Sequence, residues 1–267
     1  MSASSQERVR RSSVVASVVL GAAVAVAVLG PWLAPHDPGR TLGRPYDVDG
    51  VGWLGTEVLG RDVWSRLLHG GRPLVVVPIL ITVASTLVGT AIGVTMAASR
   101  SAGRVLRTID LFAVIPPLVV LLVLLYRFGA SALVIGLSVI VSSAPFVARY
   151  MRAAATPVLD SGWVQQARLL GDTRRVIMWR DVVPNIAGPM LADSALRLGG
   201  TFAVVAAASF LGFGPSRSAD WAVMVDENLS GIELNALAVA APAIAIASLT
   251  VPLNILGDRL AAKLARP

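Results

Sequence analysis

The sequence predicts an all-α membrane protein that crosses the bilayer with about six helices. Hydrophobic residues make up 55% of the 267 residues and charged residues only 15%, whereas soluble domains carry about 25% charged residues. The mean hydropathy is +0.72, and one compact core of this size cannot hide so much apolar surface. Lipid is therefore the expected solvent for much of the chain.

The first apolar run covers residues 14–34 and follows three arginines. A run of about 20 residues crosses ~30 Å of hydrocarbon at ~1.5 Å per residue. A cleaved signal peptide starts in the same way, but the length of the run favours a retained membrane helix. Residues 35–72 follow as a polar segment, rich in Gly and Pro and too irregular to cross.

Five further apolar runs predict the remaining crossings. They cover residues 73–98, 109–126, 131–148, 186–213 and 235–256. Backbone groups in lipid need internal hydrogen-bond partners, so each run is expected to be helical, with its prolines kinking the helix rather than ending it. The chain then divides into residues 1–72, with an N-terminal tail, the first helix and an outer segment, and residues 73–267, a core of five helices.

The basic residues predict the orientation. With the N-terminus inside, about fifteen of the 23 basic residues fall in the cytoplasmic pieces. Both termini are therefore expected in the cytoplasm. The net charge of +7 comes from arginine clusters between apolar runs rather than from one basic face, so nucleic acid is not an expected partner.

The chemistry-bearing residues exclude several classes of site. There is no cysteine, and the two histidines, His36 and His69, are far apart, so we expect no metal site and no thiol nucleophile. Lys263 is the single lysine, and no G-x-x-x-x-G-K-[ST] loop occurs. The chain cannot bind ATP in the P-loop manner, and we expect no cofactor on it. If ATP is used, another subunit hydrolyses it.

The segment 149–185 is too polar to cross the membrane and too long for a turn. Asp160 or Ser161 can cap a helix that begins near Trp163, and Gly171 is its expected C-terminal stop.

A second short helix is expected from Thr173 to about Val183, where Pro184 ends it. A short helix across the membrane face can dock a partner, or it can be an interfacial helix that only anchors the bundle. The pattern alone leaves both readings open.

The same segment resembles the EAA loop of binding-protein-dependent ABC importer permeases. Its residues 164–171 read V-Q-Q-A-R-L-L-G and residues 180–185 read R-D-V-V-P-N. The family pattern is E-A-A-x-x-x-G, about nine further residues, then a hydrophobic-x-L-P ending, and the spacing from Gly171 to Pro184 fits. The chain has Gln165 for the family's Glu, Gln166 for its first Ala and Asp181 for a frequent His.

Two further segments narrow the resemblance to the C-type subunit of dipeptide and oligopeptide permeases. Residues 54–66, L-G-T-E-V-L-G-R-D-V-W-S-R, resemble L-G-T-D-x-x-G-R-D-x-x-S-R. Residues 209–214, S-F-L-G-F-G, then Trp221 and residues 254–260, N-I-L-G-D-R-L, resemble S-F-L-G-L-G, W-G and N-x-L-G-D-x-L. The outer loop after Phe213 lacks the family's usual Pro-Pro pair. Order and spacing hold from about residue 12 to the C-terminus.

The resemblance implies a type I ABC importer permease fold in a bacterial inner membrane. It implies a pore-forming subunit that imports dipeptides or short oligopeptides, with haem or nickel complexes as alternative cargo. The implied partners are a second homologous permease subunit, an ABC ATPase that uses ATP and Mg, an extracytoplasmic substrate-binding protein and membrane lipid. This chain itself would not be an enzyme.

The resemblance also assigns residues to two sites. An ATPase-coupling loop is implied at Trp163, Val164, Gln165, Gln166, Ala167, Arg168, Leu170, Gly171, Pro184 and Asn185. An outer gate or binding-protein contact is implied at Gly55, Thr56, Gly60, Arg61, Asp62, Arg66 and Trp221. For the residues that precede the second run, a simple structured loop is the alternative.

Asp193 and Arg197 are four residues apart in the run 186–213 and would face the same side of a helix. Intramembrane charges usually face a cavity or one another. The pair is expected either to line the translocation path or to be a structural pair near the cytoplasmic edge. Gly89 and Gly93 form a small-xxx-small face, for which helix packing is favoured over gating.

Two other classes of protein remain as rivals. A secondary transporter would work without ATP and should contain inverted repeats, and we find no clear repeat of this kind. A membrane-embedded enzyme should place a polar catalytic cluster on facing helices, and only Asp193 and Arg197 come close to one.

Overall fold

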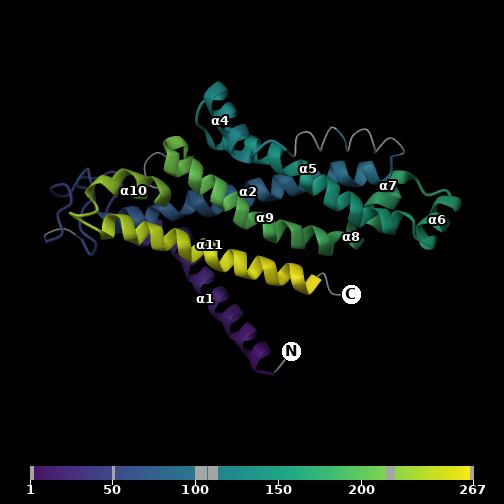
Figure 1. Ribbon diagram of the computed structural model, residues 1–267, viewed down its shortest axis with the longest axis horizontal. Helices are drawn as coiled ribbons and strands as arrows, with labels where there is room; N and C mark the ends of the chain where they lie inside the picture. Colours follow the sequence, from purple (N-terminus) through teal and green to yellow (C-terminus); the bar gives the residue numbers. More distant parts are fainter. Residues whose placement is uncertain (1–2, 50–51, 100–106, 108–113, 215–219, 265–267) are drawn as a thin grey trace.

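The computed structural model is almost entirely helical and has an elongated shape (Figure 1). It describes residues 3–49, 52–99, 107, 114–214 and 220–264. Side chains are described from Ser12 to Ala262 within these ranges.

Five helices in the described residues are long and apolar enough to cross a membrane. They are α1 (Ala3–Leu33), α2 (Val63–Ala97), α5 (Ala132–Leu159), α9 (Ala187–Ala208) and α11 (Leu237–Leu264). The shorter α4 (Pro117–Phe128) is also apolar. The expected run 109–126 is only partly covered, because residues 109–113 lie outside the described residues. Five of the about six expected crossings therefore have a helix long enough to span, and α4 covers part of the remaining run.

The prediction that proline kinks rather than ends its helix is wrong at Pro116 and Pro117. The chain turns at residues 114–116 and α4 begins at Pro117, with Pro116 extended at φ −59° and ψ 133°. A residue before proline avoids the α conformation, and a proline in the first helical turn loses no hydrogen bond. Pro78 and Pro145, in contrast, lie inside α2 and α5 as predicted.

Helix α2 begins about ten residues earlier than the apolar run predicted. Its N-cap is Asp62, whose carboxylate accepts hydrogen bonds from the backbone N–H groups of Trp64 (3.3 Å) and Ser65 (3.1 Å). Because the first turns of α2 contain polar residues, hydropathy alone did not indicate that the helix begins here. At 35 residues, α2 is longer than the ~20 residues that a bilayer requires, so its first turns project beyond the apolar layer.

The core of the bundle is the contact between α2 and α5, and α9 packs against α11. Small residues allow the first contact. A Cβ at Gly89 would lie 2.4 Å from the Val147 Cβ, and one at Gly93 would lie 2.3 Å from the Ala148 carbonyl oxygen. The small-xxx-small face therefore packs helices, as predicted.

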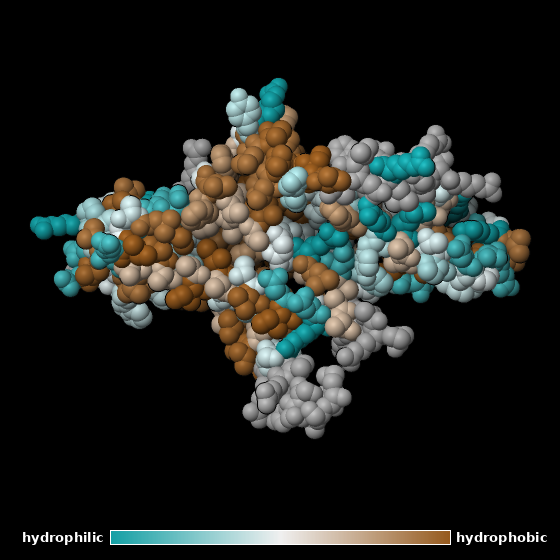
Figure 2. All heavy atoms as spheres, in the orientation of Figure 1, coloured by the Kyte–Doolittle hydropathy of each residue, from teal (hydrophilic) through white to brown (hydrophobic). Residues whose placement is uncertain are grey.

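The two ends of the bundle differ in character. One end carries the loop 34–62 and α10 (Trp221–Asn228), and the other carries the short helices between α5 and α9 (Figure 1). The C-terminal end of α11 points toward the second end, and the N-terminal part of α1 runs obliquely away from the bundle (Figure 1). Hydrophobic residues gather over the middle of the bundle and hydrophilic ones over the short helices (Figure 2).

Candidate functional site

The first candidate site is the group of short helices between α5 and α9, which we call the loop helices. They are α6 (Gly162–Leu169), α7 (Arg174–Ile177), the π-helical η1 (Met178–Val182) and α8 (Val183–Asn185). They lie at the end of the bundle opposite the loop 34–62 (Figure 1).

Helix α6 is anchored on one face and exposed on the other. Val164 and Ala167 are buried, and Val164 belongs to an apolar cluster with Met151 of α5 and Val94 of α2. Beyond this anchor the end of the helix is apolar and exposed, with Leu169 88% and Leu170 81% accessible. The sequence prediction included Leu170 and missed Leu169. Such a pair of exposed leucines at a polar end suits contact with another protein.

The remaining predicted residues of this helix lie on its exposed face. They are Trp163, Gln165, Gln166 and Arg168. Ser161 occupies the N-cap position, but its side chain makes no capping hydrogen bond, and its hydroxyl donates to the Val158 carbonyl at 2.6 Å. The Gln165 side chain instead donates to the Asp160 carbonyl at 3.1 Å, which gives the glutamine a local role at the helix start.

Gly171 ends α6 in the way that the sequence predicted. Its φ is +94°, and its N–H donates to the Arg168 carbonyl at 3.2 Å while the Asp172 N–H donates to the Ala167 carbonyl at 3.1 Å. These two bonds form a Schellman motif, which requires a left-handed residue and therefore favours glycine. The chain reverses here and enters α7, whose N-cap is Thr173.

The second short helix does not stop before Pro184, and that prediction is wrong. The helical path runs through the π-turn of η1 into α8, where Pro184 sits in the first turn and needs no N–H partner. Asn185 closes the segment by donating from Nδ2 to the Asp181 carbonyl at 2.6 Å. Pro184 and Asn185 are both exposed.

Arg180 links the segment after α6 to η1 through ion pairs with Asp172 and Asp181. Its guanidinium donates to Asp172 at 2.6 Å and to both carboxylate oxygens of Asp181, at 3.0 and 3.1 Å. Hydrogen bonds from these carboxylates raise the pKa of Arg180 above its ordinary value. Asp181, which replaces a frequent histidine of the resembling family, thus has a defined partner.

The end of the bundle that carries the loop 34–62 holds a second group of predicted residues, joined in a charge network. The buried Arg66 pairs with the buried Glu57 and with Glu227, whose carboxylate lies 2.9 Å from Nη1. Arg61 pairs with the same two glutamates. The network joins the loop before α2 to α10. The sequence prediction included both arginines and missed both glutamates.

Further hydrogen bonds hold the loop 34–62 and α10 at this end. Thr56 donates to the Arg44 carbonyl at 2.6 Å, and Asn235 donates to the carbonyls of Leu54 and Thr56, both at 3.0 Å. Trp221 donates from Nε1 to the Leu67 carbonyl at 2.6 Å.

Two glycines of the predicted set have positive φ, +71° at Gly55 and +70° at Gly60. Asp62 is the N-cap of α2 and is buried, as are Thr56, Arg66 and Trp221. The predicted residues of this end do come together, and the contacts described for them are with other residues of this chain, in the loop, in α2, in α10 and just before α11. This favours the structured-loop alternative for them.

Asp220 caps α10 in a buried position. Its carboxylate accepts hydrogen bonds from the Ser209 hydroxyl at 2.7 Å and from the Ala222 N–H at 2.9 Å. Burial raises the pKa of Asp220 to about 6, and these hydrogen bonds oppose the shift only in part. The sequence prediction missed this residue.

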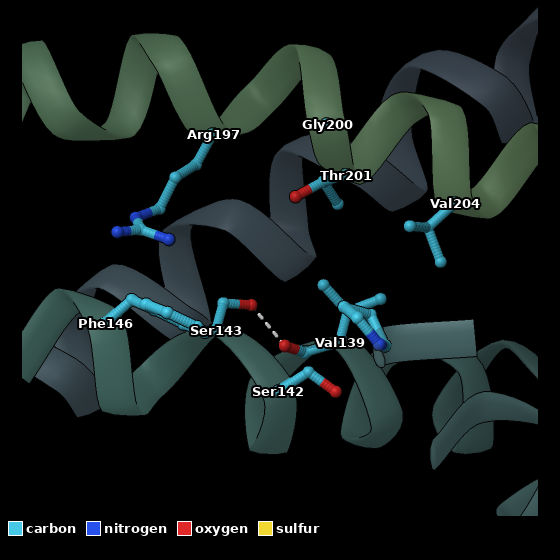
Figure 3. Close-up of a pocket in the computed structure, with 9 residues that line it drawn as sticks. Val139, Ser142, Ser143, Phe146, Arg197, Gly200, Thr201 and Val204 are labelled. Carbon is cyan, nitrogen blue, oxygen red and sulfur yellow. Dashed lines mark hydrogen bonds between the residues drawn. The ribbon is translucent and has the colours of Figure 1, made fainter. Parts of the chain in front are cut away.

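The third candidate site is a cavity of about 240 Å³ between α5 and α9. Figure 3 shows Arg197 and Thr201 of α9 facing Ser143 and Phe146 of α5. Arg197 donates from Nε to the Asp193 carboxylate at 2.6 Å. The pair is thus formed as the spacing predicted, and it lies at the middle of α9 rather than at its end.

The described residues include no group of three or more His, Asp or Glu side chains that could hold a metal ion.

These features define a class of protein: a helical membrane protein with a group of short, partly exposed helices at one end of its bundle. Residues 85–266 match the family described as binding-protein-dependent transport system inner membrane component. The match covers more than half of the chain, and the chain belongs to this family.

Curated relatives lie in peptide transport systems. The chain is 27% identical to a probable D,D-dipeptide transport system permease protein, DdpC, of Escherichia coli (strain K12), over 92% of this chain and 84% of the relative. It is 27% identical to the di/tripeptide transport system permease protein DppC of Pseudomonas aeruginosa (strain UCBPP-PA14), over 88% of this chain and 81% of the relative.

Solved structures are similar in fold. A chain of the MetNI methionine ABC transporter, in an inward-facing conformation, superposes with a TM-score of 0.59 at 16% identity, covering 75% of this chain and 97% of that one. The similarity supports the ABC importer permease fold predicted from the sequence.

Proposed function

We propose that this chain is the pore-forming subunit of an ATP-driven importer for dipeptides or short oligopeptides. The observation that carries the proposal is α6, with Val164 and Ala167 anchored in the bundle and the leucines at positions 169 and 170 exposed. The peptide substrate is supported by the names of the curated relatives.

The anchor gives α6 a mechanical role. A partner that binds the exposed end of α6, at Leu169 and Leu170, can move Val164 with it. Val164 belongs to an apolar cluster that includes Met151 of α5 and Val94 of α2. Those two helices form the central contact of the bundle. A closing motion of the partner would therefore move packed helices as a unit and alternate the access of the pore.

The partners in this proposal are the ones that the transporter class requires. An ABC ATPase, which itself binds ATP and Mg, docks on the loop helices. A second homologous permease subunit completes the pore, and an extracytoplasmic substrate-binding protein delivers the peptide. Both termini and the loop helices face the cytoplasm of a bacterial cell. ATP is hydrolysed by the ATPase and not by this chain.

The binding protein would contact the outer loop through its exposed residues rather than through the buried charge network. Trp53 is 85% accessible and stacks on Trp64, with ring centroids 5.7 Å apart. Leu234 is also exposed at this end. The network of Arg66 and Glu57 then serves to hold this surface in shape.

The test of the proposal is a charge placed on the exposed tip. Leu170→Asp should abolish co-purification of the ATPase and ATP-dependent peptide uptake in reconstituted vesicles. Leu234→Asp is the matched control, because it makes the same change at an exposed leucine on the opposite end, and the ATPase should remain bound.

A secondary transporter would behave differently in the same assay. Peptide uptake by this chain without any ATPase, or an unchanged complex in the Leu170→Asp variant, would contradict the proposal.

A further inference from the structure

The cavity between α5 and α9 is lined by a cationic side chain, Arg197, in the middle of the apolar layer. Arg197 is the eleventh residue of α9, about 15 Å along a helix that begins at Ala187. On the other side, Ser142 and Ser143 lie near the middle of α5. A solute in this cavity would therefore sit far from both ends of the bundle.

Asp193 contacts the Arg197 guanidinium only at its Nε edge. The single hydrogen bond between them uses Nε of Arg197. Within the described part of the chain, neither terminal nitrogen of Arg197 has a hydrogen-bond partner, and neither is a fully buried atom. Figure 3 shows the guanidinium on the side of α9 that faces α5. Two terminal nitrogens with donors in parallel match the two oxygens of a carboxylate.

The hydroxyls of the two serines that line the cavity from α5 offer the complementary chemistry. Ser142 donates its proton to the Ser138 carbonyl at 2.8 Å, and Ser143 donates to the Val139 carbonyl. Because both protons are used on α5 itself, the oxygen lone pairs are left to accept from an N–H group in the cavity. Val139, Phe146 and Val204 supply apolar walls.

We propose that this cavity is a transit site for a peptide, with Arg197 binding the C-terminal carboxylate and the α5 hydroxyls accepting from peptide N–H groups. The inference rests on the proposed function and adds the group of the substrate that this chain recognises. The cavity volume, about 240 Å³, is just below the range of small-ligand sites, ~300–1,000 Å³. It therefore suits the end of a short peptide.

Asp193 makes the site suitable for transit rather than for tight binding. Its carboxylate offsets the guanidinium charge at 2.6 Å, so a passing carboxylate meets hydrogen-bond donors without a full unbalanced charge. A conducting site has to bind well enough to admit its solute and weakly enough to release it.

The natural absence of cysteine in this chain allows a direct test. In the complete transporter reconstituted in vesicles, Ser142→Cys is labelled with N-ethylmaleimide in the presence of dialanine or of dialanine amide. Dialanine should slow the labelling of this chain severalfold, and the amide, which lacks the carboxylate, should not. Ser248→Cys, on α11 in a groove that faces α1, is the control and should show no protection.

Arg197 itself is tested with a charge-balanced pair of variants. The D193N/R197Q variant avoids leaving Asp193 unpaired in the bundle, and it should lose the protection by dialanine. It should also lower the rate of dialanine uptake roughly tenfold, which is the order expected for a hydrogen bond to a charged group. ATP hydrolysis stimulated by the binding protein should continue. R197K, which keeps the charge, should restore part of the uptake.

Three outcomes would overturn the inference. Equal protection by dialanine and by its amide would show that the carboxylate is not recognised. An S142C thiol that is never labelled would show that the cavity is closed to solutes. If the D193N/R197Q complex loses the second permease subunit and R197K retains it, Arg197 belongs to the subunit interface instead. If the wild-type complex imports no peptide at all, the proposed function fails as well, whereas the other three outcomes leave it standing.

Discussion

Arg180 and Asp172 are joined across the loop helices by a hydrogen bond of 2.6 Å between Nη2 and Oδ2. Asp172 follows the left-handed turn at Gly171, and Arg180 lies on η1. The pair therefore links the end of α6 to the segment that leads into α9. An exposed ion pair adds little to global stability, but this one restricts how α6 can tilt relative to its neighbours.

Arg180→Gln should loosen the loop helices without unfolding the bundle. We expect backbone hydrogen exchange in residues 162–172 to become faster, because the link to η1 is lost, while the thermal midpoint changes little. Arg175→Gln is the control, since it removes the same charge from an exposed position on α7. Unchanged exchange in the Arg180 variant would show that the pair does not restrain α6.

Gly171→Ala should weaken the docking of the ATPase. The residue has φ +94°, and a side chain in the left-handed region costs about 1 kcal/mol. If that cost is met by distorting the end of α6, affinity for the ATPase should fall about fivefold. Gly162→Ala provides the control, because Gly162 lies on the same helix with open space around its Cβ position. Affinity of the purified complexes for the ATPase is the measurement, and equal affinities would contradict the prediction.

Gly93→Ala should destabilise the contact between α2 and α5. The new methyl group would lie 2.3 Å from the Ala148 carbonyl oxygen and 3.0 Å from the Arg152 nitrogen, both backbone atoms that cannot move alone. Overpacking of this kind costs about 1–3 kcal/mol. Gly21→Ala on α1 has open space and should be neutral or slightly stabilising. Thermal unfolding in detergent compares the two, and equal midpoints would show that the helices separate to accept the methyl group.

The features that the sequence predicted are those set by local chemistry. The turn at Gly171 follows from a glycine after a short amphipathic segment, and the pair of Asp193 and Arg197 follows from a spacing of four on one helix. The helix positions follow from apolar runs. This also explains why the predicted start of α2 is about ten residues late, because the first turns of α2 after its N-cap Asp62 include polar residues and do not form an apolar run.

The features that escaped prediction depend on contacts between distant segments. Glu227 is 161 residues from Arg66, and Ser143 faces Arg197 only because α5 packs beside α9. The exposure of Leu169 depends on which face of α6 the bundle covers. A single sequence contains no local signal for any of these relationships.

Asp220 gives the molecule a pH-dependent stability. Burial raises its pKa from 3.8 to about 6, so between these two pH values the folded protein holds one proton more than the unfolded chain. Stability from this group is therefore fully present below pH 4 and is lost as the pH rises through 6. The shift corresponds to about 3 kcal/mol.

Asp220→Asn isolates this contribution, since the amide cannot ionise and can still cap α10. In thermal unfolding between pH 4 and 7, the wild type should lose stability relative to the variant as the pH rises, and no further change should appear above pH 7. Asp226→Asn, an exposed change on the same helix, should follow the wild type. Parallel curves for the wild type and the Asp220 variant would contradict the prediction, because the carboxyl group would then ionise alike in the folded and unfolded chain.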